Sequence, residues 1–289
     1  MKLHHVRQEI ARNPWAILPG KLEAMLEVVE WHAAGNQAPA YEAAAPRAPA
    51  TTGGVAVIPV YGLIAQRMNM MTAFSGGTST DMLAAQLDAA LKDPSIKGIV
   101  FDVDSPGGSV YGVPELAARI YKARGQKRMV SVSNALMASA AYWIGSAVDE
   151  MFITPSGELG SIGVVAAHYD FSKMAEAEGV KVTYITYGKH KAELAEEIPL
   201  SDDARAYLQS RVDDYGQMFD KAVAKHLGVE TATVRDSFGQ GRVFGAKDAV
   251  KLGMAHHIGT LQDAIERAGM RQRNTEALDR KVALLERTA

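Results

Sequence analysis

Residues 97–109 of this 289-residue chain read Lys-Gly-Ile-Val-Phe-Asp-Val-Asp-Ser-Pro-Gly-Gly-Ser. The apolar, β-branched run over 97–103 predicts a buried strand. Gly107 and Gly108 follow this strand, and glycines there let the backbone pass close to a ligand and present its N–H groups. Such donors can stabilise a carbonyl oxygen that gains negative charge in a transition state. The same pair would also suit a tight turn that needs positive φ, so this stretch alone leaves both interpretations open.

On both sides of this stretch, short β-branched runs alternate with amphipathic runs, which is typical of an α/β domain. The expected strands cover residues 55–60, 97–103, 129–133, 150–154 and 181–187. The expected helices cover residues 81–91, 114–123, 169–178, 202–227 and 246–252, with another starting near 138. Ser201 is the expected N-cap of the long helix, because acidic residues follow it in the first turn.

Composition divides the chain into four zones. Residues 1–35 are expected to be helical, since apolar residues recur at helical spacing between Pro19 and Gly35. Residues 36–54 are rich in Ala and Pro and are expected to form a linker. Residues 55–269 carry the α/β pattern and form the main domain, and residues 270–289 form a highly charged tail.

Composition also excludes several classes of function. The chain has no cysteine, which rules out disulfides, thiolate metal sites, iron–sulfur clusters and a cysteine nucleophile. The formal net charge of −2 provides no basic field for nucleic acid. We find neither a secretory signal nor an apolar run long enough to span a membrane, so we expect no membrane-spanning segment.

A candidate nucleophile lies in residues 134–143, which read Asn-Ala-Leu-Met-Ala-Ser-Ala-Ala-Tyr-Trp. A strand is expected to end here and a helix of very small residues to begin near Ser139. The hydroxyl would then lie at a helix N-terminus with room for a substrate, and the N–H of Ala140 could bind an oxyanion together with the glycine pair. Alternatively, Ser139 is simply packed in a helix of small residues.

A serine nucleophile needs a base, and histidine is the usual one. None of the eight histidines has a spacing typical of a triad, and we expect them to be solvated or locally bonded. They are His4, His5, His32, His168, His190, His226, His256 and His257. His256 and His257 could suggest a metal site, but no carboxylate at metal-ligand helical spacing supports one.

Lysine is the other candidate base. Lys189 and Lys191 follow directly after the strand expected over 181–187. A lysine in water is protonated and cannot accept a proton, whereas burial in an apolar site favours the neutral amine. A neutral lysine could take the proton of a serine. The alternative interpretation is an exposed basic loop.

Five segments resemble, in order, the motifs of the S49 peptidase family, which includes signal peptide peptidase A and phage head-maturation proteases. Between them they extend over more than half of the chain, from Gly98 to about Gly259. The segments are Asp104–Val110, Met137–Tyr142, Gly160–Val164, Tyr187–Lys191 and Gly241–Phe244, the last followed by Ala249, Gly253 and Met254. Ala140 and Ala141 replace two glycines of the family pattern and narrow the space beside Ser139. Ala192 replaces a Ser or Asp, which leaves the base in place but not its usual helper contact.

The resemblance implies a ClpP/crotonase-like α/β fold of repeated β-β-α units and a Ser-Lys dyad. It implies that Ser139 is the nucleophile and Lys191 the general base. The N–H groups of Gly107 or Gly108 and of Ala140 would form the oxyanion hole. No cofactor and no metal are implied. The chain has one copy of each motif, which implies a homo-oligomer whose dyad is shared between subunits.

Within the family, the start of the chain, Asn-Pro-Trp-Ala-Ile-Leu-Pro over residues 13–19, resembles prophage-encoded members. The expected function is therefore proteolysis of capsid, scaffold or portal proteins in the assembling head, inside the host cytoplasm. The N-terminal zone is either a docking or self-processing segment or a helix that packs on its own domain.

Three other functions stay open on the sequence alone. A soluble signal-peptide-peptidase-like hydrolase would share the site and cleave small peptides. A crotonase-type acyl-CoA enzyme would share the fold and the oxyanion loops but not need Ser139. A non-catalytic capsid scaffold would self-associate without hydrolysis.

Overall fold

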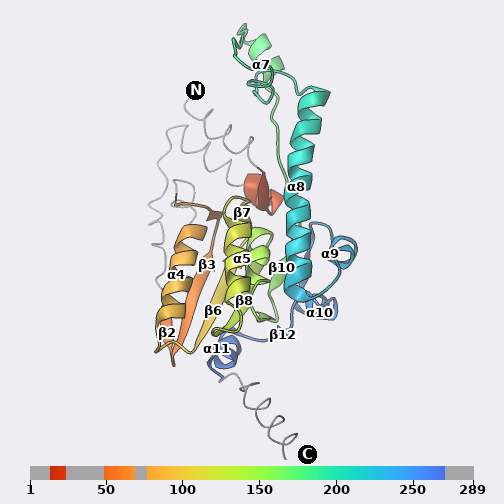
Figure 1. Cartoon of the computed structure of the whole chain (residues 1–289). Helices are drawn as coiled ribbons and strands as arrows, with labels where there is room; N and C mark the ends of the chain where they lie inside the picture. Colours follow the sequence, from red (N-terminus) through yellow and green to blue (C-terminus); the bar gives the residue numbers. More distant parts are fainter. Residues whose placement is uncertain (1–13, 24–48, 69–76, 271–289) are drawn as a thin grey trace, which may run out of the picture.

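A mainly parallel sheet forms the centre of the computed structural model, which describes residues 14–23, 49–68 and 77–270 (Figure 1). Strands β3, β6, β8 and β9 run parallel to one another, and β10 pairs in parallel with the end of β8. Short strands complete the edges. The eight strands within these residues are β2 (Ala50–Thr52), β3 (Val55–Tyr61), β6 (Gly98–Ser105), β8 (Arg128–Ala138), β9 (Glu150–Ile153), β10 (Glu158–Gly160), β11 (Val243–Gly245) and β12 (His257–Ile258).

A second, smaller sheet lies at the carboxyl end of β6. Its order is β1-β7-β4-β5, and β7 follows β6 after a single residue, Pro106. Strand β1 pairs antiparallel with β7, whereas β4 runs parallel to β7 and to β5. Its strands are β1 (Trp15–Ile17), β4 (Ile64–Ala65), β5 (Thr78–Ser79) and β7 (Gly107–Ser109). The glycine pair is therefore held between two neighbouring strands.

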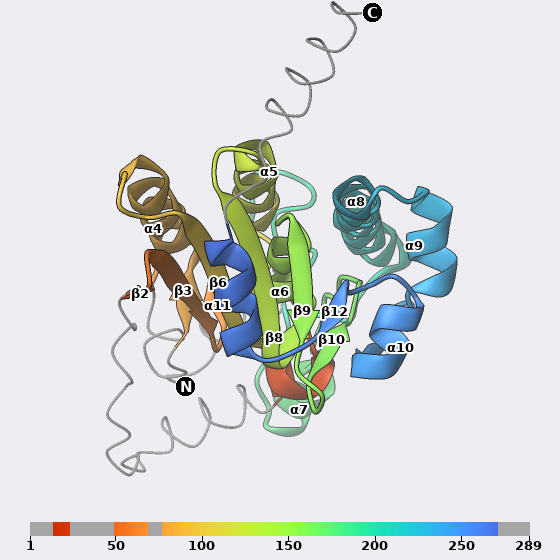
Figure 2. The same ribbon diagram turned by 90° about the horizontal axis from the view of Figure 1, so that it is seen from below.

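Helices cover both faces of the large sheet (Figure 2). One face carries α4 (Thr80–Lys92), α5 (Val113–Ala123) and α6 (Ala140–Gly145), whose apolar residues share the main core with alternate residues of the strands. The other face carries α11 (Leu261–Gly269), whose buried alanines pack on Val100 and Val130. Strands that are buried on both faces read as continuous apolar runs, as residues 98–103 do.

The long helix α8 (Asp202–Leu227) joins the body of the molecule to a projecting arm, residues 172–201 (Figure 1). Its second half packs on the core, where the Phe219 ring stacks on Trp143 with centroids 4.4 Å apart. Its first half extends beyond the sheet together with α7 (Ser172–Ala177). Helices α9 (Thr231–Ser237) and α10 (Ala246–Lys251) follow beside its C-terminal end. Among the residues described, none of the helices combines the length and the apolarity needed to cross a bilayer.

Most of the expected elements are confirmed. The long helix covers residues 202–227 as predicted, and the Ser201 side chain caps it by accepting a hydrogen bond from the Ala204 N–H. The strand expected over 129–133 is longer, because its end pairs with β10 as far as Ala138. Strands β1 and β2 lie in zones expected to be helix and linker. Residues 1–13, 24–48 and 271–289, which hold most of those zones and nearly all of the predicted tail, lie outside the described residues.

The strand predicted over 181–187 is wrong for the single chain. These residues form no ladder and are exposed, with Ile185 and Tyr187 almost fully so. Their alternating β-branched and aromatic residues have high strand propensity, but a strand needs a partner for its backbone groups. The described part of this chain provides none.

A buried histidine contacts the C-terminal end of helix α6. His226, at the end of α8, is 7% exposed, and its Nδ1 lies 2.9 Å from the Oγ of Ser146, which ends α6. Burial, together with the charges of Arg124 and Lys225, lowers the pKa of His226 from 6.5 to about 4. At a pH between these two values, His226 is protonated in the unfolded chain and neutral in the folded chain.

We therefore expect acid to weaken this protein through His226. Going from pH 7.5 to pH 5 is expected to remove about 2 kcal/mol of unfolding free energy through this group alone. Urea unfolding of wild type and His226→Gln at both pH values measures the contribution. The variant is expected to lose less stability on acidification, and an equal loss in both proteins would contradict the assignment.

Candidate active site

Ser139 lies where β8 ends and α6 begins, in a backbone conformation that side chains rarely adopt. Its φ is 54° and its ψ is −116°, and its side chain is fully buried. The neighbouring structure holds it there: the Ser139 N–H donates to the Gly160 carbonyl over 2.8 Å, and its carbonyl accepts from the Trp143 N–H over 2.9 Å. Strained residues cluster at functional sites, and a strand-to-helix turn of this kind presents the nucleophilic serine of α/β-hydrolases.

The segment that follows β10 forms one wall around Ser139. The Ser139 hydroxyl lies 3.4 Å from the Gly163 carbonyl. Within the same segment Ser161 is also buried, has a φ of 53°, and donates its N–H to the Arg242 carbonyl over 2.7 Å. The sequence indicated this segment only through the family resemblance, and no local pattern would have predicted the strain at Ser161.

The glycine pair and the start of α6 lie side by side, as predicted. A Cβ added to Gly107 would lie 3.1 Å from the Ala140 nitrogen, and Gly107 has a φ of 101°. As the first residue of α6, Ala140 has no carbonyl within the helix to accept its N–H. The N–H of Gly107 donates to the Oγ of Ser105 over 3.2 Å. The positive φ shows that the turn interpretation also holds for Gly107.

Gly108 is required by packing. A Cβ at this position would lie 1.9 Å from the Ile64 carbonyl oxygen, because β7 runs directly beside β4. No side chain fits there. The two glycines therefore bring β7 close to both β4 and the start of α6.

The structure places Lys191 far from Ser139 within one chain. Lys191 is exposed and lines a cavity of about 590 Å³ with His190, Asp203 and Tyr207, beside the first turns of α8. Helix α6, which begins beside Ser139, packs instead on Phe219, which lies 16 residues after Asp203 along α8. At 1.5 Å per residue this separation is about 24 Å along the helix axis. A single chain does not bring the two predicted dyad members together.

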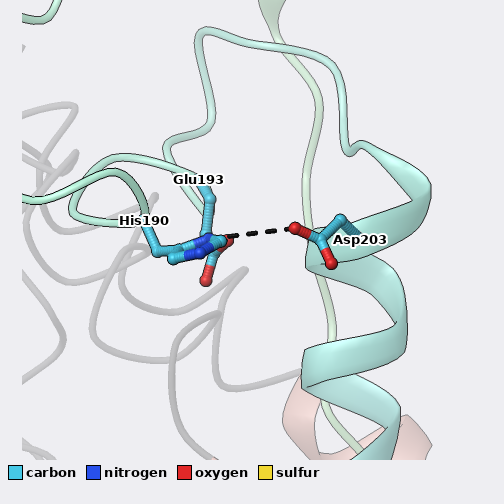
Figure 3. A group of neighbouring side chains, drawn as sticks. All are labelled: His190, Glu193 and Asp203. Carbon is cyan, nitrogen blue, oxygen red and sulfur yellow. Dashed lines mark hydrogen bonds and ion pairs between the residues drawn. The ribbon is translucent and has the colours of Figure 1, made fainter.

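His190 contributes to a small cluster beside Lys191 (Figure 3). Its Nδ1 lies 2.6 Å from a Glu193 carboxylate oxygen and 3.9 Å from one of Asp203. Ligand atoms of the three residues lie within 4.8 Å of one another, so they could hold a metal ion. His190 and Asp203 are exposed, and a surface ion pair explains the arrangement equally well. The sequence analysis missed this cluster, although the His-x-x-Glu spacing indicated its first contact.

The late histidines have local partners, as expected. The His256 Nδ1 accepts the Met151 N–H over 3.0 Å, and the His257 Nε2 lies 2.9 Å from a Glu150 carboxylate oxygen. His226 likewise contacts Ser146. These local contacts give the buried His226 and the adjacent pair His256 and His257 a structural explanation.

Comparison with known proteins gives one family and several relatives. The model of peptidase family S49 matches residues 122–275. The chain is 34% identical over 212 residues to capsid assembly protease C of Escherichia phage lambda, covering 73% of this chain and 48% of the relative. It is 32% identical over 241 residues to the head-tail preconnector protein GP5 of Enterobacteria phage P21, covering 83% and 46%. It is 29% identical over 224 residues to protease 4 of Salmonella typhi, covering 77% and 35%. The chain thus spans about half the length of the two phage relatives.

Proposed function

Because the chain belongs to peptidase family S49, we propose that it is a serine endopeptidase with a dyad of Ser139 and Lys191. The observation that carries the proposal is the strained, buried conformation of Ser139 directly beside Gly107 and Ala140. Backbone strain of this kind clusters at functional sites, and at Ser139 it coincides with a free helix N-terminus and the glycine pair.

The proposed reaction is acyl transfer to Ser139. Its Oγ attacks a peptide carbonyl while the neutral amine of Lys191 accepts the hydroxyl proton. The N–H of Ala140, with that of Gly107 or Gly108, stabilises the oxyanion. Lys191 then protonates the leaving amine, and water hydrolyses the acyl-enzyme.

Lys191 must come from a neighbouring copy of the chain, since the two groups are far apart within one copy. Several features support this part of the proposal. The arm that carries Lys191 projects from the body (Figure 1). It also exposes large apolar side chains, which a contact with another subunit would bury. These side chains are Met174, Val180, Val182, Tyr184, Ile185 and Tyr187. In such an assembly residues 181–187 could also gain the strand partner they lack.

We further propose that residues 55–269 form one domain with a ClpP/crotonase-like fold. Two repeated units support it. Strand β3 is followed by β4 and β5 of the smaller sheet and then by α4, and β6 is followed in the same way by β7 and α5. Each unit thus has one strand in the large sheet, then one or two short strands in the small sheet, and then a helix.

The proposed substrate is a capsid, scaffold or portal protein, cleaved in the host cytoplasm during head maturation. The names of the two phage relatives support this choice, because one is a capsid assembly protease and the other a head-tail preconnector protein. A soluble peptide hydrolase with the same site is the second candidate, supported by the similarity to protease 4. A crotonase-type acyl-CoA enzyme would not need the strain at Ser139.

Co-expression tests the substrate. The protein is produced together with a phage portal, scaffold or major capsid protein, and the products are analysed by mass spectrometry. Cleavage of one of these proteins at a defined bond is the expected result, with unfolded casein as a general substrate for comparison. Casein degradation without head-protein cleavage would favour the peptide hydrolase. Intact substrates in both arms would contradict a peptidase.

A further inference from the structure

Strand β1 is bonded along both of its edges by segments that surround Ser139. On one edge Trp15, Ala16 and Ile17 lie opposite Ser109, Gly108 and Gly107 of β7, and the Leu18 N–H donates to the Pro106 carbonyl over 3.0 Å. On the other edge the N–H and C=O of Trp15 bond to the C=O and N–H of Val165, at 2.8 and 2.9 Å. Val165 belongs to the segment that passes Ser139 at Gly163.

The middle of β1 lies at the predicted oxyanion hole. The point where a Cβ of Gly107 would lie is 2.2 Å from the Ala16 carbonyl oxygen and 3.1 Å from the Ala140 nitrogen. The carbonyl of Ala16 and the N–H of Ala140 therefore both lie close to this point. A peptide carbonyl under attack by Ser139 would have to be in this region.

The side chains of β1 alternate between two environments. Ala16 is fully buried in the main core. Trp15 and Ile17 point the other way into a separate apolar cluster with Leu22 and Leu63, against which Val165 and Tyr169 also pack. A strand places alternate side chains on opposite sides. The space that β1 fills therefore offers a narrow position for one side chain, with a large apolar position before and after it.

We infer that β1 occupies the binding groove for the substrate peptide and blocks it until it is displaced. The inference rests on the proposed function and extends it to the ligand: an extended segment with a small residue where Ala16 lies and large apolar residues on either side. An extended peptide added between two strands is a common mode of recognition, in which main-chain bonds give affinity and alternate pockets give specificity. Trp15 and Ile17 show what the cluster around Leu63, Val165 and Tyr169 accepts.

The burial of Ser139 supports a blocked state. Its exposed fraction is zero, so no protein substrate can reach the hydroxyl in this arrangement. β1 is only three residues long and carries the groups that a substrate would present. Its departure would free the edges of β7 and Val165 together.

A reversible disulfide tests this inference. Trp15 lies opposite Ser109, and the alternation of the ladder from the Leu18–Pro106 bond makes them a non-hydrogen-bonded pair, whose short Cα separation suits a disulfide. The chain has no other cysteine, so Trp15→Cys with Ser109→Cys forms one defined bond. Both changes are made in a Ser139→Ala background, where binding is measured without hydrolysis. The ligand is a fluorescein-labelled Asn-Pro-Trp-Ala-Ile-Leu-Pro peptide, followed by anisotropy.

The reduced protein is expected to bind this peptide about tenfold or more tightly than the oxidised one, because the apparent Kd scales with the fraction of molecules whose groove is open. Ser109→Cys alone, taken through the same oxidation and reduction, controls for the treatment and should show no change. A peptide with Lys in place of Trp and Ile is expected to bind at least about tenfold more weakly. Equal binding in the two redox states would overturn the inference.

A second variant covers the case in which the cysteine pair disturbs folding. Ala16→Glu places a carboxylate at a fully buried position and is expected to expel β1, whereas Ala16→Ser keeps the residue small. Tighter peptide binding by Ala16→Glu than by Ala16→Ser supports the inference, and equal or weaker binding contradicts it. Because binding needs no catalysis, an inactive wild type would reject the proposed function while leaving these results readable.

Discussion

Ser139→Ala is expected to lower kcat/KM for peptide hydrolysis by about 10⁴-fold or more, because the whole nucleophilic route depends on one hydroxyl. The loss is measured with a quenched fluorescent peptide. A fluorophosphonate reagent gives an independent readout, since it labels only an activated serine. Wild type is expected to be labelled once and the variant not at all.

Ser131→Ala is the matched control. Ser131 lies on β8, the strand that ends just before Ser139, is fully buried, and donates to the Gly145 carbonyl over 2.8 Å. Its replacement removes one buried hydrogen bond, which costs about 1 kcal/mol of stability, and should leave hydrolysis and labelling intact. If Ser139→Ala kept its activity, or if both variants lost it equally, Ser139 would not be the nucleophile.

The second large effect concerns Lys191. Lys191→Ala is expected to be as inactive as Ser139→Ala, because the hydroxyl then has no proton acceptor. Mixed assemblies of these two variants are nevertheless expected to recover about a quarter of the wild-type activity, since random mixing pairs an intact serine of one copy with an intact lysine of the next in that share of sites. Co-expression with two different affinity tags isolates the mixed assemblies for the assay.

Lys189→Ala serves as the control in the same loop, two residues away, and is expected to keep most of the activity. Full activity in Lys191→Ala would reject this base and move attention to Lys189 or His190. Mixed assemblies without recovered activity would show that each chain completes its own site, through a rearrangement of the arm.

Local patterns were sufficient to predict the elements around the proposed site, whereas the roles of its residues came from the family resemblance. The buried strand over residues 97–103, the glycine pair behind it and the strand-to-helix junction at Ser139 all follow from residues that are close in sequence. Parallel strands bring their carboxyl ends to one edge of a sheet, so the proximity of Gly107 to Ala140 follows from the order of the elements.

The rest depended on partners that are distant in the sequence. Nothing in Trp15-Ala16-Ile17 indicates that it pairs with residues 107–109, 90 to 94 positions later. Residues 181–187 have the composition of a strand but no partner in the described chain, so propensity alone gave the wrong prediction. The proposed pairing of Ser139 with Lys191 can be read neither from local sequence patterns nor from a single copy, because it depends on a contact between two copies of the chain.

The close packing of β7 has a consequence for attempts to retarget this protein. A Cβ at residue 108 would lie 1.9 Å from the Ile64 carbonyl oxygen, and residue 107 has a φ of 101°, which other amino acids rarely adopt, so both positions favour glycine whether or not β1 is in place. A mutagenesis library directed at the glycines would return mostly inactive clones. Libraries at Leu63, Val165 and Tyr169 change side chains around the alternate apolar positions instead, and are the better starting point for changing the proposed peptide preference.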